Sequence, residues 1–296
     1  MSHGLLTAPR RPAGRRPWPW HRAFLVPLLV VLAMTTLLPL AFTALQSVGL
    51  FSGDASPGDM SYGELLTSST FHNALWVQAV FVVGAVVTEM VAGTGLALLL
   101  NRPGRWASFL RGIVLGPVLL PTIVVALIAS YMLQSNVGLI SVLLAPFGLE
   151  QAWLASGPSA IAVLIAVDVW QYTPIVAILV LAGLQGVPHE TIEAARLDGT
   201  SRRQLLWLVV LPQVMPAIVA AGLIRFIDAI QVFPTIYVLT SGGPGISTSA
   251  LNYFGFIEYF QLGNQRTGAA SAVILTAITV VIAVVITRRL QAKAGI

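Results

Sequence analysis

The chain has 296 residues and a formal net charge of +5; 56% of its residues are hydrophobic and only 9% are charged, whereas an ordinary soluble domain has about 25% charged residues. This composition predicts a membrane protein. The absence of cysteine excludes disulfides, thiolate metal sites and cysteine nucleophiles. The one lysine, Lys293, lies in the C-terminal tail, so the chain has no P-loop and is not expected to hydrolyse ATP itself.

Six apolar runs follow one another along the chain, and each approaches or exceeds the roughly 20 residues that span a bilayer. They cover Phe24–Gln46, Ala74–Leu100, Phe109–Leu133, Ala160–Leu184, Leu206–Ile230 and Ala269–Thr287. The first run is too long for the apolar core of a signal peptide and lacks a convincing cleavage site, so we interpret it as a helix. The sequence therefore predicts an all-α membrane protein, a bundle of six transmembrane helices.

Basic residues predict the orientation of these helices. Fourteen of the sixteen lie before the first run, in or beside the second and fourth connections, or at the C-terminal end of the chain. The first and third connections, Ser47–Asn73 and Gln134–Ser159, have none. The positive-inside rule then places both termini in the cytoplasm. We expect a cytoplasmic arginine-rich segment at 1–23, a transmembrane domain at 24–290 and a cytoplasmic tail at 291–296. The basic surplus reflects topology and contact with membrane lipid, and no nucleic acid partner is expected.

The fourth connection, within residues 186–205, carries the polar stretch "TIEAARLDGTSRRQ" between two apolar runs. Pro188 suits the first turn of a short helix, and Gly199 suits a left-handed cap at its end. Ser201 and Gln204 have the spacing of a capping box that opens the next helix. The pattern predicts a short cytoplasmic helix, a glycine break and a new helix that enters the membrane through Leu211 and Pro212.

This stretch resembles the EAA loop of ABC-importer permeases: Glu193-Ala194-Ala195, then Gly199, then Val209 in place of isoleucine, then Leu211-Pro212. The resemblance implies a fold similar to type I ABC importer transmembrane domains. It also implies a coupling helix that docks in a cleft of a separate ATP-binding subunit. The residues given this coupling role are Glu193, Ala194, Ala195, Asp198, Gly199, Leu211 and Pro212.

Two further stretches resemble the carbohydrate branch of that family, of the maltose and glycerol-phosphate type: Val169–Ser201, with its "AGLQ" run, and Val232–Gly245, with its "GGP" turn. The resemblance implies a bacterial inner-membrane permease that forms half of the translocation path for a sugar or sugar-like solute. Its expected partners are a second, homologous permease subunit, a dimer of ATP-binding subunits and an extracytoplasmic solute-binding protein. ATP and magnesium would be bound by the partner ATPase, so neither a cofactor nor a metal is expected in this chain.

Ionisable residues inside the expected helices cost roughly 2.5–3.5 kcal/mol each at a helix centre unless they face a cavity or a partner. These residues are Glu89, Asp168, Arg225 and Asp228. Arg225 and Asp228 lie three residues apart and share a helix face. They either neutralise each other or line the solute path. Glu89 has no partner that the sequence reveals.

Asp168, Trp170, Gln171 and Tyr172 form a second candidate group for the solute path. A carboxylate, an amide and aromatic rings together suit a sugar, because they bind its hydroxyl groups and its apolar C–H face. The alternative interpretation is that the aromatic rings pack against neighbouring helices and Gln171 joins two helices by a hydrogen bond.

Other functions stay open at this point. An ABC importer for a polyamine, phosphate or amino acid would carry the same coupling loop. An ion-driven secondary transporter would show internal repeats, and none is evident. A membrane-embedded enzyme would need a converging nucleophile or metal set, for which Asp168 and Asp228 are poor candidates.

Overall fold

The protein is described from a computed structural model that covers residues 20–50, 56–101, 104–135, 137–147 and 152–294. All regular elements in these ranges are helical, as expected for a chain whose backbone must satisfy its hydrogen bonds within a bilayer. The chain divides into two compact units, Met1–Thr43 and Ala44–Ile296. The predicted arginine-rich segment lies mostly outside the described residues.

The first unit contains α1 (Trp20–Leu32), the π-helical segment η1 (Ala33–Leu37) and the start of α2 (Leu38–Ser47). Residues Leu25–Ser47 are long and apolar enough to cross a membrane, with a mean hydropathy of 2.4. The helical first span that the sequence predicts is therefore confirmed.

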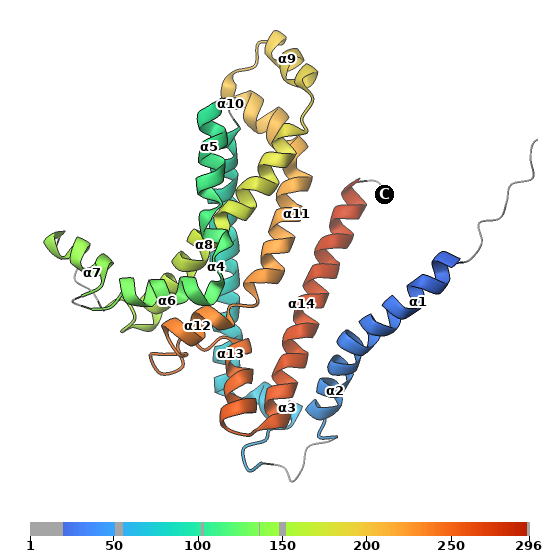
Figure 1. The fold of residues 1–296 in the computed structure, drawn as a ribbon, viewed down its shortest axis with the longest axis vertical. Coiled ribbons are helices and arrows are strands. Elements are labelled where there is room, and N and C mark those ends of the chain that lie inside the picture. Colours follow the sequence, from blue (N-terminus) through green and yellow to red (C-terminus); the bar gives the residue numbers. More distant parts are fainter. Residues whose placement is uncertain (1–19, 51–55, 102–103, 136, 148–151, 295–296) are drawn as a thin grey trace, which may run out of the picture. The chain divides into compact units, whose positions relative to one another are not determined.

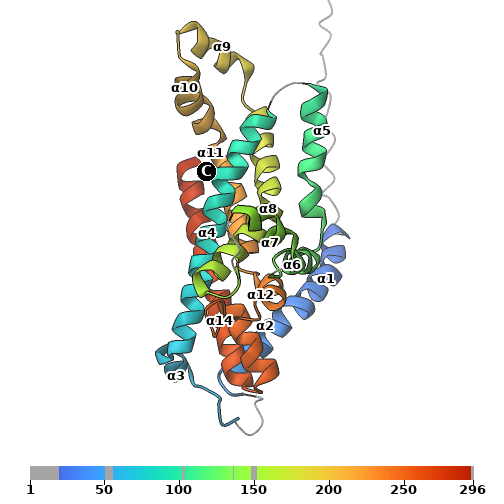
Figure 2. The same cartoon turned by 90° about the vertical axis from the view of Figure 1, so that its left-hand side faces the viewer.

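The second unit is built around α4 (Ser69–Leu100), α8 (Gly157–Gln185) and α11 (Leu211–Ala229), which pack against one another and run side by side in Figures 1 and 2. The long helix α14 (Gln265–Ala294) packs mainly on the short α13 (Leu251–Phe256) and the π-helical η5 (Ile257–Gln261). Three more candidate spans in this unit match expected ones: Ser69–Leu100, Gly157–Gln185 and Arg202–Ala229. The last expected span matches Gln265–Arg289.

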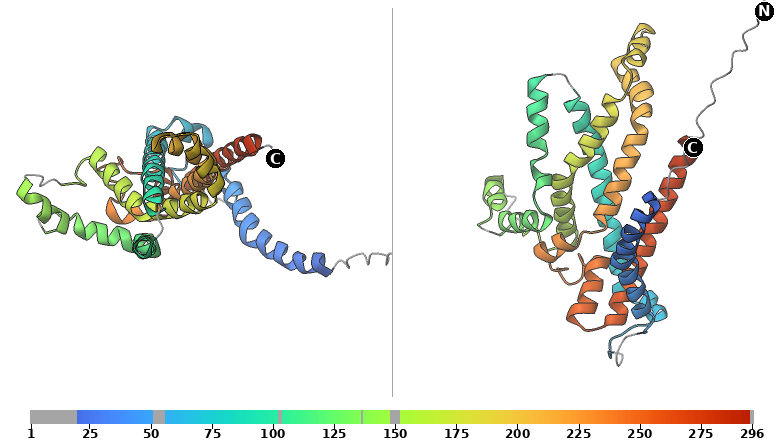
Figure 3. Two further views of the ribbon diagram at one scale, coloured as in Figure 1. Left: turned by 90° about the horizontal axis from the view of Figure 1, so that it is seen from above. Right: turned by 45° about the vertical axis from the view of Figure 1, so that its right-hand side comes forward.

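The third expected span, Phe109–Leu133, is wrong as a continuous helix. The structure has α5 (Arg105–Val114), a 3₁₀ turn η2 (Gly116–Leu119) and α6 (Thr122–Met132) instead. Pro117 lies in the first turn of η2 and Pro121 is the N-cap of α6, because proline lacks the N–H that an uninterrupted helix needs. After this break α6 and α7 (Leu139–Leu144) run to one side, across the direction of α4 (Figures 1 and 3). Only α6 remains as a shorter apolar helix of this region.

Three further short elements are α3 (Tyr62–Thr67), α12 (Phe233–Leu239) and the 3₁₀ turn η3 (Ala145–Phe147). The helix α3 lies at the end of the unit opposite the EAA stretch (Figure 2), α12 packs on α6, and η3 packs on α7. The Asp59 carboxylate accepts hydrogen bonds from the backbone N–H groups of Arg266 and Thr267 at 3.1 and 3.5 Å. These bonds tie the segment before α3 to the start of α14.

Close packing of α4 on α8 depends on a missing side chain at Gly93. A Cβ added at Gly93 would lie 2.6 Å from Cβ of Val176 and 3.1 Å from the backbone oxygen of Thr173. Small residues at such positions let helices in membranes approach closely enough for dispersion contacts between their backbones. Gly93 therefore allows the two most extensively packed helices to approach at this point.

We expect Gly93→Ala to lower the free energy of unfolding by about 1–3 kcal/mol, the usual cost of overpacking. Gly95→Ala on the same helix is the matched control, because nothing lies within 4 Å of its added Cβ. That control should be neutral or slightly stabilising, since alanine favours helices over glycine by up to about 1 kcal/mol. Thermal unfolding in lipid discs measures both. Equal shifts for the two variants would contradict the packing argument.

Candidate functional site

The EAA stretch forms the short helix α9 (His189–Leu197) at the tip of a loop between α8 and α11, as Figure 2 shows. Pro188 is the N-cap of α9, one position earlier than expected. Gly199 has φ +75°, so the predicted left-handed break is confirmed. The N–H of Thr200 donates to the carbonyl oxygen of Ala195 at 3.2 Å, which satisfies a carbonyl at the end of α9.

The predicted capping box is also present. The N–H of Gln204 donates to Oγ of Ser201 at 3.3 Å, and the N–H of Ser201 donates to Oε1 of Gln204 at 2.9 Å. These bonds open α10 (Arg202–Gln204), which continues through the π-helical η4 (Leu205–Val210) into α11. Leu211 is the first residue of α11, and Pro212 follows in its first turn. The chain from α10 through η4 into α11 is therefore one continuous helix, which the break at Gly199 separates from α9.

One face of α9 packs against the rest of the chain, and the other face is exposed. Ala195 is buried, and Ile192 packs against a core cluster that includes Val187 and Val214. Glu193, Ala194 and Asp198 are exposed. Leu197, two residues after the EAA motif, is 89% exposed, and the sequence motif gave no reason to expect a role for it. An exposed leucine beside exposed Glu193 and Ala194 gives α9 a mixed apolar and acidic surface.

A buried cluster of charged side chains joins α4, α8 and α11. Arg225 donates from Nε to Oε2 of Glu89 at 2.7 Å, and from Nη2 to Oε1 of Glu89 at 2.8 Å. The same Nη2 donates to Oδ2 of Asp168 at 2.8 Å. Arg225 and Glu89 have no exposed surface, and Asp168 is 6% exposed. This arrangement neutralises the guanidinium by a bidentate carboxylate pair and a second carboxylate, and it connects three helices at one point.

Tyr172 and Asp228 complete the cluster. The guanidinium carbon of Arg225 lies 4.0 Å from the centre of the Tyr172 ring, a cation–π distance. The Tyr172 hydroxyl shares a hydrogen bond of 2.7 Å with Oγ1 of Thr122 on α6. Nη1 of Arg225 lies 3.6 Å from Oδ2 of Asp228, and this nitrogen has no hydrogen-bond partner. Arg225 and Asp228 therefore form the ion pair that one interpretation of the sequence expected, but the hydrogen bonds of Arg225 run to Glu89 and Asp168. Glu89 has the partner that the sequence did not reveal.

Trp170 and Gln171, the other two candidates for the solute path, point elsewhere. Trp170 is 54% exposed and lines an apolar cavity of about 370 Å³ with residues of α6, among them Val125 and Ile128. Nε2 of Gln171 donates to the carbonyl oxygen of Leu120 at 3.0 Å, and its Oε1 is buried without a partner. The group 168–172 thus divides between the charge cluster and the α6 side of α8.

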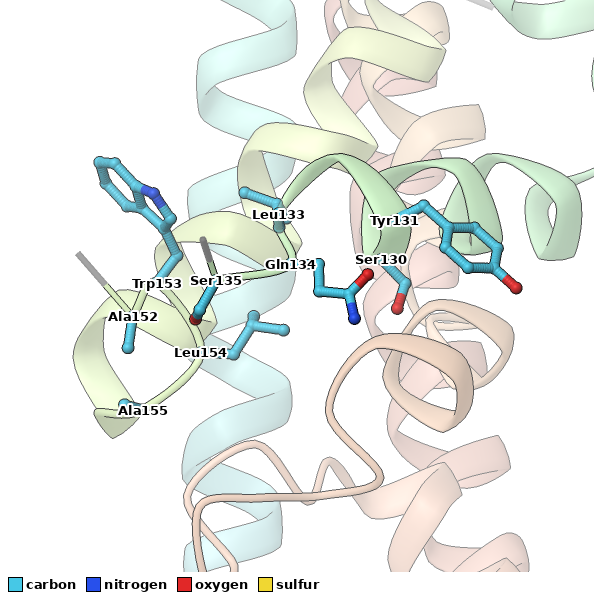
Figure 4. Close-up of a pocket in the computed structure, with 9 residues that line it drawn as sticks. All are labelled: Ser130, Tyr131, Leu133, Gln134, Ser135, Ala152, Trp153, Leu154 and Ala155. Atoms are coloured by element: carbon cyan, nitrogen blue, oxygen red, sulfur yellow. The ribbon is translucent and has the colours of Figure 1, made fainter. Parts of the chain in front are cut away.

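A second cavity, of about 440 Å³, lies at the end of α6, away from all the candidate residues. Figure 4 shows the Gln134 amide near the Ser130 hydroxyl on one side of it, whereas the Trp153 indole points away from both. Among the described residues no group of three or more His, Asp or Glu side chains is placed to bind a metal ion.

The family model of the binding-protein-dependent transport system inner membrane component matches residues 89–294. This chain belongs to that family. The match contains the charge cluster and the whole EAA loop. An ion-driven secondary transporter and a membrane-embedded enzyme, which the sequence alone left open, are thereby set aside.

Relatives and solved structures agree with this assignment. The trehalose/maltose transport system permease protein MalF of Thermococcus litoralis is 33% identical over 84% of this chain and 86% of its own length. The trehalose transport system permease protein SugA of Mycobacterium tuberculosis is 31% identical over 81% of this chain and 78% of its own. A bacterial ABC transporter that imports the acidic polysaccharide alginate has a chain of the same fold, with a TM-score of 0.80, 18% identity, and coverage of 93% of this chain and 96% of that one. The predicted fold class, that of an ABC importer transmembrane domain, is confirmed.

Proposed function

We propose that this chain forms half of the translocation path for a sugar or sugar-like solute, and that α9 docks on a separate ATP-hydrolysing subunit. The observation that carries the proposal is the exposed helix α9, which presents the EAA motif at the tip of the loop between α8 and α11. The chain itself is a non-catalytic membrane subunit, so ATP and magnesium are bound by the partner.

Coupling follows from the short connection between α9 and the continuous helix of α10, η4 and α11. A force on α9 reaches α11 through α10 and η4 without an intervening flexible turn other than Gly199 and Thr200. The charge cluster then joins α11 to α4 and α8. ATP binding in the partner would draw two coupling helices together and turn the path outward, because a ligand shifts a two-state equilibrium only through different contacts in the two states. Hydrolysis would reset the transporter.

The sugar assignment rests on the relatives and on the candidate residues of the path. The relatives reported above carry names for trehalose and maltose transport. The other half of the path would come from a second, homologous permease, and a solute-binding protein would deliver the solute. The distribution of basic residues supports a position of both termini and of α9 on the cytoplasmic side of a bacterial inner membrane. Polyamine, phosphate or amino acid import remains the alternative.

The test is to purify this chain together with the products of its neighbouring genes and to measure ATP hydrolysis in lipid discs. Sugars and polyols are added one at a time with the solute-binding protein. We expect an ATPase subunit to copurify and one sugar to raise the rate. A chain that purifies alone, and that binds no added ATPase subunit, would contradict the coupling role. Stimulation by an amino acid or polyamine, and by no sugar, would contradict the sugar assignment.

A further inference from the structure

Asp228 carries a carboxylate within a membrane-spanning helix, and this carboxylate is exposed. Its side chain is 45% exposed. It follows Arg225 by one helical turn, and Arg225 is bound to Glu89 and Asp168, each of which lies at least 11 residues from either end of its helix. Asp228 is the penultimate residue of α11, and its contact with Arg225 places it at the depth of the interiors of α4 and α8. A charge at that depth does not face lipid, so its open side faces water or a partner subunit.

No free cation accompanies Asp228 at this depth. Arg225 is fully buried, with Nε and Nη2 bonded to carboxylates and Nη1 turned toward Asp228. The other basic residues within the five candidate spans of the described chain lie at the ends of those spans: Arg202, Arg203, Arg266, Arg288 and Arg289. Within the five candidate spans of the described chain, the helix interiors therefore offer the accessible carboxylate of Asp228 and no accessible guanidinium or ammonium group.

This distribution of charge has a direct consequence for the solute. Proteins bind carboxylate, sulfate or phosphate groups with charge-assisted hydrogen bonds from arginine or lysine. An ionised carboxylate only accepts hydrogen bonds, so it pairs with the hydroxyl groups of a neutral sugar and repels an anion. Repulsion is strongest in a narrow site where little water screens the charges.

We infer that this chain's half of the path selects sugars that carry no acidic group, and that Asp228 is the residue that rejects acidic ones. The inference rests on the proposed function, because it places Asp228 on the path that this chain shares with a second permease. Asp228 could instead have a structural role and only contact the second permease. The test must distinguish that role from selectivity against acidic sugars.

The test uses the assembled complex in lipid discs, without the solute-binding protein, so that the selectivity of the binding protein does not enter. Matched pairs of probes are titrated by saturation-transfer NMR: trehalose and maltose, each against its uronic acid counterpart. In the wild-type complex at pH 7 we expect at least tenfold weaker binding of the acid in the pair that binds. Asp228→Asn should reduce that ratio at least threefold, because it removes the charge and keeps the size.

Glu64→Gln is the matched control, since it removes one carboxylate charge outside the candidate spans and glutamine still completes a capping box with Ser61. It should leave the ratio unchanged. Equal binding of acid and neutral sugar by the wild type would overturn the inference and leave the proposed function standing. A neutral preference that Asp228→Asn does not change would assign the selectivity to the partner permease and also overturn it. Binding of no sugar at all would overturn the inference, whereas the proposed function is tested separately by the ATP hydrolysis assay with the solute-binding protein.

Discussion

Arg225→Met should lower the free energy of unfolding by roughly 3–5 kcal/mol, the cost of breaking a buried ion pair from one side. The variant leaves Glu89 without its bidentate partner and Asp168 without the donor at 2.8 Å. Both carboxylates stay enclosed between α4, α8 and α11. Thermal unfolding of the chain in lipid discs measures the loss.

The triple variant Glu89→Gln, Asp168→Asn, Arg225→Met is the control for this prediction. It removes all three buried charges, and replacing a whole buried ion cluster by uncharged residues is often neutral or stabilising. We expect it to recover most of the stability that Arg225→Met loses. If Arg225→Met unfolds at the wild-type temperature, the cluster does not hold the three helices together.

Gly199→Val should abolish transport while the partner ATPase continues to hydrolyse ATP. Nothing lies within 4 Å of a Cβ added at Gly199, so the effect comes from the backbone and not from a clash. At φ +75° an L-residue costs about 1–2 kcal/mol, and a β-branched one is a still rarer occupant of that region. The chain relaxes by turning the residues after α9, which changes the position of α9 relative to α10.

Gly199→Asn separates this backbone effect from the mere loss of glycine, because asparagine tolerates the left-handed region better than most residues. It should keep most of the uptake. Uptake of the solute and hydrolysis of ATP are measured together in vesicles that contain the complete transporter. Wild-type uptake by Gly199→Val would show that the break after α9 plays no part in coupling.

Local chemistry explains which features the sequence predicts well. The φ of Gly199 and the capping box of Ser201 and Gln204 depend on residues within a few positions, so their pattern can be read without knowledge of the fold. The same holds for the five long apolar helices, whose length and composition predict that they span a membrane. The break within residues 109–133 was missed because the run was judged by hydropathy, although Pro117 and Pro121 stand at the two ends of the turn that divides it.

The charge cluster was only partly predictable, because its members are far apart in the chain. Glu89 and Arg225 are separated by 136 residues, and Asp168 and Arg225 by 57. The sequence shows that three acids and one arginine lie in helices and need partners. It does not show which helices meet. Sequence spacing suggested a pairing of Arg225 with Asp228, three residues apart. The hydrogen bonds of Arg225, at 2.7 and 2.8 Å, instead run to acids on other helices.

The most direct test of the account asks whether α9 touches the ATP-hydrolysing subunit. The chain has no cysteine, so Leu197→Cys introduces one unique thiol on α9, at a side chain that is 89% exposed. Leu262→Cys is the control, because Leu262 is 57% exposed and follows η5, which continues α13. Figure 1 shows α13 at the end of the second unit opposite α9. Each thiol is labelled with a maleimide that carries a photoreactive group, and the complex is irradiated in lipid discs. We predict that the label at position 197 cross-links to the ATP-binding subunit and the label at position 262 does not. Cross-linking from position 262 alone would contradict the proposed coupling.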